Sequence, residues 1–373
     1  MSNDNHVPLA SKYRPKKFSD IIGQKTTVQA ISNAFKSGDL HHAYILAGNL
    51  GCGKTSSARV IAATENCMNS KVEPCGECLN CEEIFTGKSI DVKEIDAASN
   101  RGIDDIRDLK KEAQFSPVNC SVKYFIFDEA HSLTGHAAEA ALKVVEEPPK
   151  RVRFIFCTTR PEAIISTIRS RCLLFKFNKV SWSEIYSHLA KIAKQENVEF
   201  EEDALKLAAK AARGSVRDAL QNLQSVIAYA GTEKLTYQAA REILGVSDES
   251  LYFQLFGAIV KVDAAKGMLV INNLLSDGRE AKQITEGIEW HLRNLMVMLT
   301  CAKDLAPFGF LEDEIKRYKH QATSLTEKGT KVQMVLDWLS LLHDVNKGLI
   351  VNLEPQVLLE TFVVKAIISK KAR

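Results

Sequence analysis

The sequence has no run of apolar residues long enough to span a bilayer, which takes about 20 residues in a helix. Its first ten residues are mostly polar and lack the apolar segment of a secretory signal. We therefore expect a cytoplasmic protein with no membrane partner. The net charge is only +3, so the chain is not a polycation. Any contact with nucleic acid must come from a local patch of charge.

Internal repeats and low-complexity tails are also absent from the sequence. Apolar residues make up 45% of the 373 residues and charged residues 25%, which is normal for a globular protein. A chain of this length is expected to form two or three domains. It can bury a sizeable core without disulfides.

Five short apolar segments precede residue 178 and are rich in Ile, Val, Phe and Tyr. They are Ala43–Ala47, Val92–Ile95, Val122–Phe127, Phe154–Cys157 and Cys172–Phe177. Buried parallel strands have this composition, and the segments between them are long enough for crossover helices. We predict an α/β domain over residues 1–178, with a parallel sheet covered by helices on both faces. Helical spacing then predicts a small helical domain at 179–246 and an all-helical domain at 247–373.

A phosphate-binding loop follows the first of these strands. Its sequence fits G-x-x-x-x-G-K-[ST] and reads Gly48-Asn49-Leu50-Gly51-Cys52-Gly53-Lys54-Thr55. The helical stretch Ser56–Ala63 comes next, which is the context that the motif requires. Glycines let backbone N–H groups turn toward phosphate oxygens, and the helix points its positive end at the same place. We expect Lys54 to reach the outer phosphates of a nucleotide and Thr55 to be a ligand of Mg²⁺.

The third apolar segment ends in two carboxylates, Asp128 and Glu129. Alone, such a pair is often only a solvated strand end. Beside a phosphate loop, Asp128 is predicted to hold Mg²⁺ and Glu129 to polarise the water that attacks the γ-phosphate. Nucleotide binding needs only the first carboxylate, whereas hydrolysis also needs the second. The pair therefore predicts an ATPase with Lys54, Asp128 and Glu129 as catalytic residues.

Four of the nine cysteines, Cys67, Cys75, Cys78 and Cys81, lie within fifteen residues of one another. In a reducing compartment such a cluster indicates a metal site rather than a disulfide framework. Four thiolates suit tetrahedral zinc, and four protein ligands leave no open position for a catalytic water. We predict a structural zinc site, with an iron–sulfur cluster as the alternative.

The Asp-Glu pair and the number of strands resemble the AAA+ ATPases. In that family a polar residue at the end of the next strand senses the γ-phosphate, which implies Thr158, with Thr159 as the reserve candidate. Ser170-Arg171-Cys172 matches the Ser-Arg-Cys motif of clamp loaders, in which the arginine enters the ATP site of a neighbouring subunit. Gly214-Ser215-Val216-Arg217-Asp218-Ala219-Leu220 resembles the second sensor of the family, which implies that Arg217 reaches the ATP of its own subunit.

Bacterial clamp loaders insert the four-cysteine segment between the two ATP-binding motifs, as this sequence does. Further matching segments are Lys12-Tyr13-Arg14-Pro15, Ile22-Gly23-Gln24, His41-His42-Ala43-Tyr44, Glu94-Ile95-Asp96-Ala97-Ala98-Ser99 and Glu146-Glu147-Pro148-Pro149. The resemblance covers residues 11 to about 220 almost continuously. Delta-prime subunits share the cysteines but have a broken phosphate loop, so the intact loop here resembles the ATP-binding gamma/tau family. Asn352-Leu353-Glu354-Pro355 resembles the collar of the family more weakly.

The resemblance implies an ATP-dependent motor subunit of the DNA sliding-clamp loader in the replicative DNA polymerase holoenzyme. Its implied cofactors are ATP, Mg²⁺ and zinc, with ATP held between Lys12–Gln24, the phosphate loop and the small helical domain. The implied partners are delta and delta-prime subunits, further copies of this chain, the sliding clamp and primer–template DNA. Asn100 and Arg101 open a predicted helix, and a helix start with an arginine suits a DNA phosphate.

Two alternatives stay open. One is an assembly subunit of the same complex that binds ATP without hydrolysing it, against which Glu129 argues. The other is a different AAA+ DNA remodeller, which would lack the cysteine cluster and Ser-Arg-Cys. The sequence also departs from the family: Arg160 stands where an acid is more common, and Ala141 and Val145 replace bulkier residues. The chain ends at Arg373, whereas the longer tau form continues into segments that bind helicase and polymerase.

Overall fold

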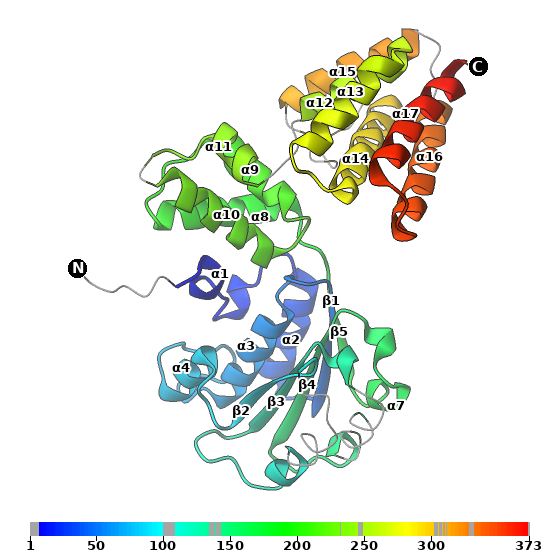
Figure 1. Ribbon diagram of the computed structural model, residues 1–373. Helices are drawn as coiled ribbons and strands as arrows, with labels where there is room; N and C mark the ends of the chain where they lie inside the picture. Colours follow the sequence, from blue (N-terminus) through cyan, green and yellow to red (C-terminus); the bar gives the residue numbers. More distant parts are fainter. Residues whose placement is uncertain are drawn as a thin grey trace. The chain divides into compact units, whose positions relative to one another are not determined.

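The computed structural model in Figure 1 describes residues 7–99, 109–133, 138, 142, 144–231, 233–244, 249–301, 305, 308, 310, 312–327 and 332–371. The chain divides into two compact units, Met1–Leu244 and Gly245–Arg373. Within the described ranges, no helix is both long enough and apolar enough to cross a membrane.

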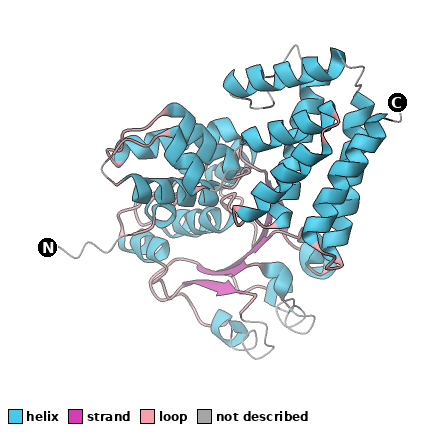
Figure 2. Cartoon of the chain, turned by 45° about the horizontal axis from the view of Figure 1, so that its top comes forward, coloured by secondary structure: helices cyan, strands magenta, loops and turns pink. Residues whose placement is uncertain are grey.

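A five-stranded sheet forms the centre of the first unit, with the strand order β2-β3-β4-β1-β5. The strands are β1 (Ala43–Gly48), β2 (Val92–Asp96), β3 (Lys123–Asp128), β4 (Val152–Thr158) and β5 (Leu173–Phe177). All neighbouring pairs are parallel. The predicted parallel sheet is therefore confirmed. Among the described residues, strands occur in this unit alone (Figure 2).

Both faces of the central strands β1, β3 and β4 are buried, as the apolar composition of these strands predicts. Successive residues of β1 alternate between two separate apolar clusters: Tyr44 and Leu46 belong to one, and Ala43, Ile45 and Ala47 to the other. Among its described residues, this α/β region has the helical elements α1 (Leu9–Lys12), η1 (Phe18–Asp20), α2 (Lys25–Ser37), α3 (Lys54–Asn66), α4 (Leu79–Thr86), η2 (Ala130–Ser132), η3 (Pro161–Ala163) and α7 (Ser166–Arg169). Helices α2, α3 and α4 all contribute to the cluster that contains Tyr44.

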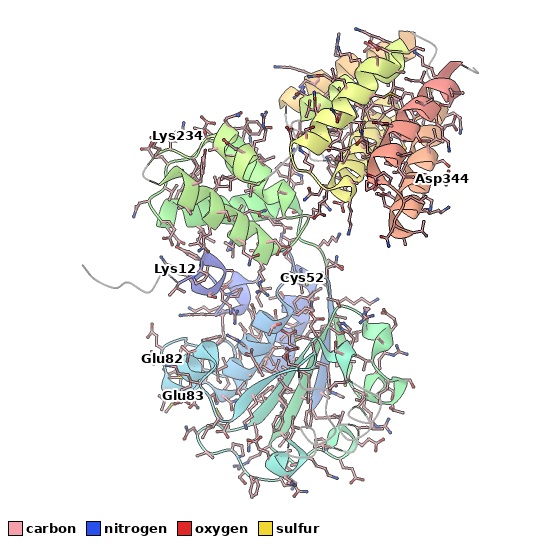
Figure 3. All side chains as sticks on the ribbon, in the orientation of Figure 1. Lys12, Cys52, Glu82, Glu83, Lys234 and Asp344 are labelled. Carbon is pink, nitrogen blue, oxygen red and sulfur yellow. The ribbon has the colours of Figure 1, made fainter. Side chains whose placement is uncertain are left out.

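Four helices complete the first unit. They are α8 (Trp182–Gln195), α9 (Glu202–Ala211), α10 (Val216–Ala230) and α11 (Tyr237–Ile243). Side chains of Ser181, Ser215 and Thr236 cap three of them by accepting a backbone N–H from the first turn, which fixes where each helix begins. The N-terminal segment packs here too, because Lys12, labelled in Figure 3, forms an ion pair with Glu196 at 2.7 Å.

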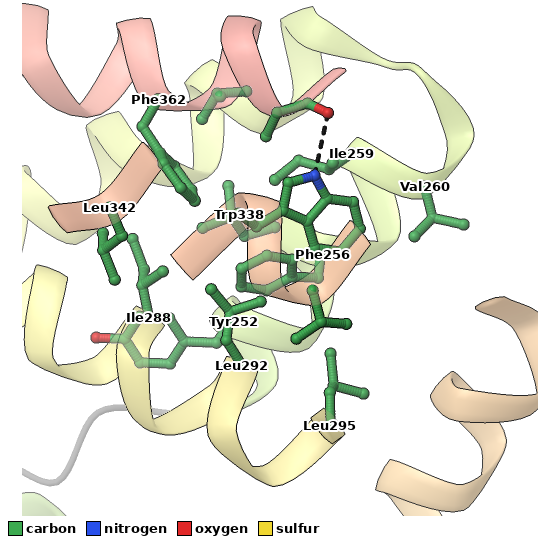
Figure 4. Packing of buried hydrophobic residues seen from close by; sticks show 14 of the residues in the cluster. Tyr252, Phe256, Ile259, Val260, Ile288, Leu292, Leu295, Trp338, Leu342 and Phe362 are labelled. Carbon is green, nitrogen blue, oxygen red and sulfur yellow. Dashed lines mark hydrogen bonds between the residues drawn. The ribbon is translucent and has the colours of Figure 1, made fainter. Parts of the chain in front are cut away.

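The second unit contains helices only, as far as its described residues go. They are α12 (Glu249–Lys261), α13 (Ala264–Ser276), α14 (Ala281–Thr300), α15 (Glu312–Glu327), α16 (Val332–Ile350) and α17 (Pro355–Lys371). Their apolar faces meet around Trp338, which is fully buried against Phe256 and Phe362 (Figure 4). The indole N–H of Trp338 donates to the carbonyl of Ala366 at 3.2 Å. The division of the whole chain into three domains stays a prediction.

The central position of Trp338 predicts a large loss of stability when it is truncated. Trp338→Ala should lower the free energy of unfolding of the second unit by about 3–5 kcal/mol, because it leaves a cavity in the core. Urea denaturation followed by circular dichroism measures this loss. The control is Trp290→Ala, because Trp290 is 55% exposed and stacks on Arg293, a contact that contributes at most about 1 kcal/mol at an exposed site. Equal losses in both variants would contradict this account of the core.

Candidate functional site

The phosphate loop connects the end of β1 to the start of α3, as the motif predicts. Gly51 and Gly53 have φ angles of 69° and 100°, which side chains rarely allow. At Gly48 the constraint is a close approach, since a Cβ there would lie 2.2 Å from the backbone oxygen of Phe177. The backbone conformation of the loop therefore requires glycine at these three positions. Cys52 marks the loop in Figure 3.

Lys54 is the first residue of α3, and its side chain is hydrogen-bonded to the backbone of the loop that precedes the helix. Its side-chain Nζ donates to the carbonyls of Gly48 and Asn49, both at 2.9 Å, and the residue is only 5% exposed. Cys52 is buried, and its thiol also donates to Asn49 at 2.8 Å, whereas Leu50 is exposed. One buried ammonium group therefore stands inside the ring of backbone that the motif forms.

The two predicted magnesium ligands are in direct contact. The hydroxyl of Thr55 donates to Oδ2 of Asp128 at 3.0 Å. Thr55 comes from the first turn of α3 and Asp128 from the last residue of β3, so two elements far apart in sequence meet here. A hydroxyl beside a carboxylate is a suitable donor set for Mg²⁺ in a nucleotide site.

Glu129 follows Asp128 in the left-handed conformation, with φ of 48°. Its backbone N–H donates to Oδ1 of Asp128 at 3.0 Å. Its carboxylate Oε2 lies 3.3 Å from Nδ1 of His131, and the same nitrogen lies 3.2 Å from the hydroxyl of Thr158. The predicted sensor and the predicted base therefore share one neighbour. Sequence reasoning missed His131, although it stands in the same Asp-Glu-Ala-His string.

The start of α10 lies against the phosphate loop. The backbone N–H of Val216 donates to the carbonyl of Gly51 at 3.0 Å, and that of Arg217 approaches it at 3.4 Å. A Cβ added to Gly51 would lie 2.0 Å from the hydroxyl of Ser215. Arg217, the second residue of α10, thus lies beside the loop, where the family resemblance implies a second sensor.

Arg14 is a further cation of this region that sequence reasoning did not assign. Burial lowers the pKa of its guanidinium, and the positive charges of Arg59 and Arg217 lower that pKa further. Asp128 and Glu94 oppose this effect by stabilising the charged form. Although Lys12-Tyr13-Arg14-Pro15 carries the family resemblance, the sequence alone gives Arg14 no role, because its charged neighbours come from distant segments.

A cleft of about 1100 Å³ lies beside the N-terminal segment, between residues 12–32 and helix α8. Tyr13, Arg14 and Gly23 are among its lining residues. They belong to the range Lys12–Gln24, which was predicted to flank the nucleotide. The residues that line the cleft do not include the phosphate loop, so the cleft alone does not define the nucleotide site.

The four predicted cysteine ligands converge between α3 and α4. The sulfur atoms of Cys67, Cys75, Cys78 and Cys81 all lie within 4.8 Å of one another. Sulfurs bound at 2.3 Å around a tetrahedral zinc are about 3.8 Å apart, and the sulfurs of Cys75 and Cys81 are 4.0 Å apart. Helix α4 also carries Glu82 and Glu83, which Figure 3 labels.

The thiols of this cluster differ in their environments. Backbone N–H groups of Glu77 and Cys78 lower the pKa of Cys75 to about 6, which favours its thiolate form. Burial raises the pKa of Cys81 instead. A bound cation would favour the thiolate form of every ligand. The donor set and its spacing therefore fit zinc.

Arg171 stands between α7 and β5. Its Nη2 forms an ion pair with Oε1 of Glu146 at 2.7 Å, and the side chain is 39% exposed. Its Nη1 donates to the carbonyl of Thr167 at 2.9 Å. These contacts hold the guanidinium against residues of its own chain and leave part of the side chain accessible to solvent.

The predicted DNA-contacting residues Asn100 and Arg101 lie outside the described residues, as does Ala141. Thr159, the reserve sensor, follows the last residue of β4 and is partly exposed. Thr158 is fully buried and is in contact with His131. The geometry favours Thr158 over Thr159 as the residue that faces the carboxylates.

Models of three families match consecutive parts of the chain. Residues 23–181 match the DNA polymerase III delta subunit. Residues 184–232 match the ATPase lid domain of the DNA polymerase III clamp loader subunit. Residues 235–344 match domain III of the DNA polymerase III subunits gamma and tau.

Curated relatives agree with these matches. DNA polymerase III subunit gamma of Buchnera aphidicola is 36% identical over 91% of this chain and 92% of that protein. Subunit tau of Escherichia coli is 39% identical over 73% of this chain, which corresponds to 42% of the tau chain. The structure of RuvB from Thermotoga maritima aligns over 83% of this chain and 91% of that one, with a TM-score of 0.49 and 18% identity, too distant to bear on function. This chain belongs to the gamma/tau family of DNA polymerase III clamp-loader subunits, which are AAA+ ATPases.

Proposed function

We propose that this chain uses ATP to drive the opening of a sliding clamp and the binding and release of primer–template DNA. The observation that carries the proposal is the meeting of the phosphate loop, the Thr55–Asp128 pair and Glu129 in one place. A nucleotide can drive the assembly only as far as it favours one arrangement of the subunits over another. The gamma/tau family membership supplies the type of assembly.

Nucleotide binding is assigned to the residues Gly48–Thr55. Lys54 would exchange its bonds to two loop carbonyls for bonds to the outer phosphates, which keeps a buried cation paired in both states. Thr55 and Asp128 would hold Mg²⁺, which neutralises charge on the phosphates. Arg217 would approach the same nucleotide from the start of α10, because that helix is bonded to Gly51.

Hydrolysis is assigned to Glu129. Its carboxylate follows the magnesium ligand Asp128 directly, and the left-handed backbone turns it out of the line of the strand. A carboxylate in this place orients a water and accepts its proton. This arrangement favours a hydrolysing subunit over an assembly subunit that only binds ATP, since binding alone would not require a second positioned carboxylate.

Arg171 is proposed to act on the nucleotide of a neighbouring subunit. It is partly exposed, it lies two residues before β5, and its contacts hold it to Glu146 and to Thr167 of α7. A guanidinium has five N–H donors, so these contacts leave donors for a phosphate. An arginine supplied in this way stabilises the charge that develops on the transferred phosphoryl group.

The assembly is proposed to contain delta and delta-prime subunits and further copies of this chain, acting on a sliding clamp. Within each chain we assign nucleotide binding to residues 1–178, a lid to 179–246 and the oligomerising collar to 247–373. DNA would be held mostly through its phosphates, because a loader must act at any sequence. Asn100 and Arg101 remain the candidate DNA contacts. The cysteine cluster is proposed to hold zinc as a structural element between α3 and α4.

The phosphate loop and the base predict different losses. Lys54→Ala should abolish ATP binding, because the loop loses its buried cation. Glu129→Gln should bind ATP normally but hydrolyse it roughly a hundredfold more slowly, since a positioned base is lost. Binding of a fluorescent ATP analogue and steady-state turnover in the assembled loader with DNA measure the two effects. Normal turnover by Glu129→Gln would show that this carboxylate has been given the wrong role.

The cysteine cluster predicts one zinc ion per chain, bound by sulfur at about 2.3 Å. Elemental analysis and X-ray absorption spectroscopy of the purified protein measure both quantities. Cys78→Ser should lower zinc content and thermal stability while ATP binding persists, whereas Cys301→Ser, outside the cluster, should keep its zinc. Iron in place of zinc, or a folded protein without metal, would refute the assignment.

The shared site predicts complementation between two inactive variants. Arg171→Ala should bind ATP as an isolated chain, yet lose about a thousandfold in turnover per affected site in the ring. Mixing Arg171→Ala chains with Lys54→Ala chains should restore part of the activity, because some interfaces then pair an intact loop with an intact arginine. If mixed rings form and no activity returns, Arg171 does not act across the subunit boundary.

A further inference from the structure

His131 lies between the two parts of the site that must act together. It belongs to the short helix η2, and its side chain is 10% exposed. Nδ1 of the ring is 3.3 Å from the carboxylate of Glu129 and 3.2 Å from the hydroxyl of Thr158. One ring nitrogen thus faces the proposed base and the proposed sensor at once.

Nδ1 can make only one of these two hydrogen bonds at a time, because one requires Nδ1 to accept a proton and the other requires it to donate one. The oxygen of Thr158 already accepts the backbone N–H of Arg160 at 3.0 Å, and Thr158 is fully buried, so its hydroxyl proton needs an acceptor. Nδ1 accepts that proton only while it carries none itself. To bind the carboxylate of Glu129, Nδ1 must carry a proton and donate it.

The backbone of Glu129 is held in place independently of this choice. Its φ of 48° is uncommon for a residue with a side chain. Its N–H donates to Asp128 at 3.0 Å and its carbonyl accepts the N–H of Ser132 at 2.8 Å. Such conformations persist where surrounding contacts fix them and are common at functional sites. With the backbone fixed, the orientation of the carboxylate depends on what its side chain contacts.

We propose that His131 is a positioning residue that links Thr158 to Glu129. When the Thr158 hydroxyl donates to an outer phosphate, Nδ1 no longer accepts from it. The ring then changes tautomer through solvent water, which supplies a proton to Nδ1 and takes one from Nε2, with no change in the charge of the ring. Nδ1–H donates to the carboxylate of Glu129 and fixes its orientation toward the attacking water. This inference rests on the proposed role of Glu129.

Two substitutions at His131 separate this role from simple packing. His131→Phe keeps a ring of similar size and removes Nδ1, whereas His131→Asn places a side-chain amide near the position of Nδ1. In the assembled loader with clamp and primer–template DNA, His131→Phe should lower kcat at least about tenfold, as losing a hydrogen bond to a charged group does. The dissociation constant for ATP should stay the same. His131→Asn should keep most of the rate.

A double-mutant cycle with Glu129→Gln tests whether His131 acts through the carboxylate. In the Glu129→Gln background, His131→Phe should have no further effect on the single-turnover rate of hydrolysis. An equal loss in both backgrounds, or an unchanged kcat in His131→Phe, would overturn the inference. If His131→Phe does not fold, His131→Gln takes its place, because its amide reaches the position of Nε2 rather than that of Nδ1.

The outcomes also distinguish this inference from the proposed function. If Glu129→Gln loses turnover while His131→Phe keeps it, only the positioning role of His131 is wrong. If Glu129→Gln itself hydrolyses ATP at the normal rate, the proposed base and the inference that rests on it are both wrong.

Discussion

The register of the parallel sheet is the constraint on which the whole site depends. Ala47 of β1 pairs with Thr158 of β4, and Phe127 of β3 pairs with Phe156 two residues before it. The loop, the two carboxylates and the sensor therefore leave the sheet at the same edge. Because side chains alternate along a strand, a slip of one residue would turn them to the opposite face. Burial of both faces of the central strands opposes such a slip, since β1, β3 and β4 each supply apolar residues to two clusters.

A second close contact links this edge to the helices that follow the sheet. The carbonyl of Gly51 accepts the first N–H group of α10, and a side chain at position 51 would collide with the hydroxyl of Ser215. The position of Arg217 therefore depends on the conformation of the phosphate loop. If nucleotide binding changes that conformation, the change reaches α10 through contacts already present within the first unit. This is a direct physical route from ATP to a rearrangement of the subunit.

The residues that sequence reasoning identified are those with local signatures. The five strands, the loop Gly48–Thr55 and the four cysteines were recognisable because spacing along the chain determines their chemistry. His131 and Arg14 were not, since their roles depend on partners that other strands and helices bring to them. The same holds for the ion pair between Arg171 and Glu146, which joins segments 25 residues apart in the chain. A single sequence predicts which functional groups a site contains better than it predicts which of those groups are in contact.

We propose that ATP binding and ATP hydrolysis drive different steps of clamp loading: binding opens the clamp and grips the DNA, and hydrolysis releases both. A ring that contains this chain can be mixed with a fluorescently labelled clamp and primer–template DNA, in the presence of either ATP or a non-hydrolysable analogue. Fluorescence then follows clamp opening and the release of the clamp on DNA in one reaction. The account predicts that the analogue supports opening and DNA binding but not release, whereas ATP supports all three. Full release with the analogue, or no opening with either nucleotide, would contradict it.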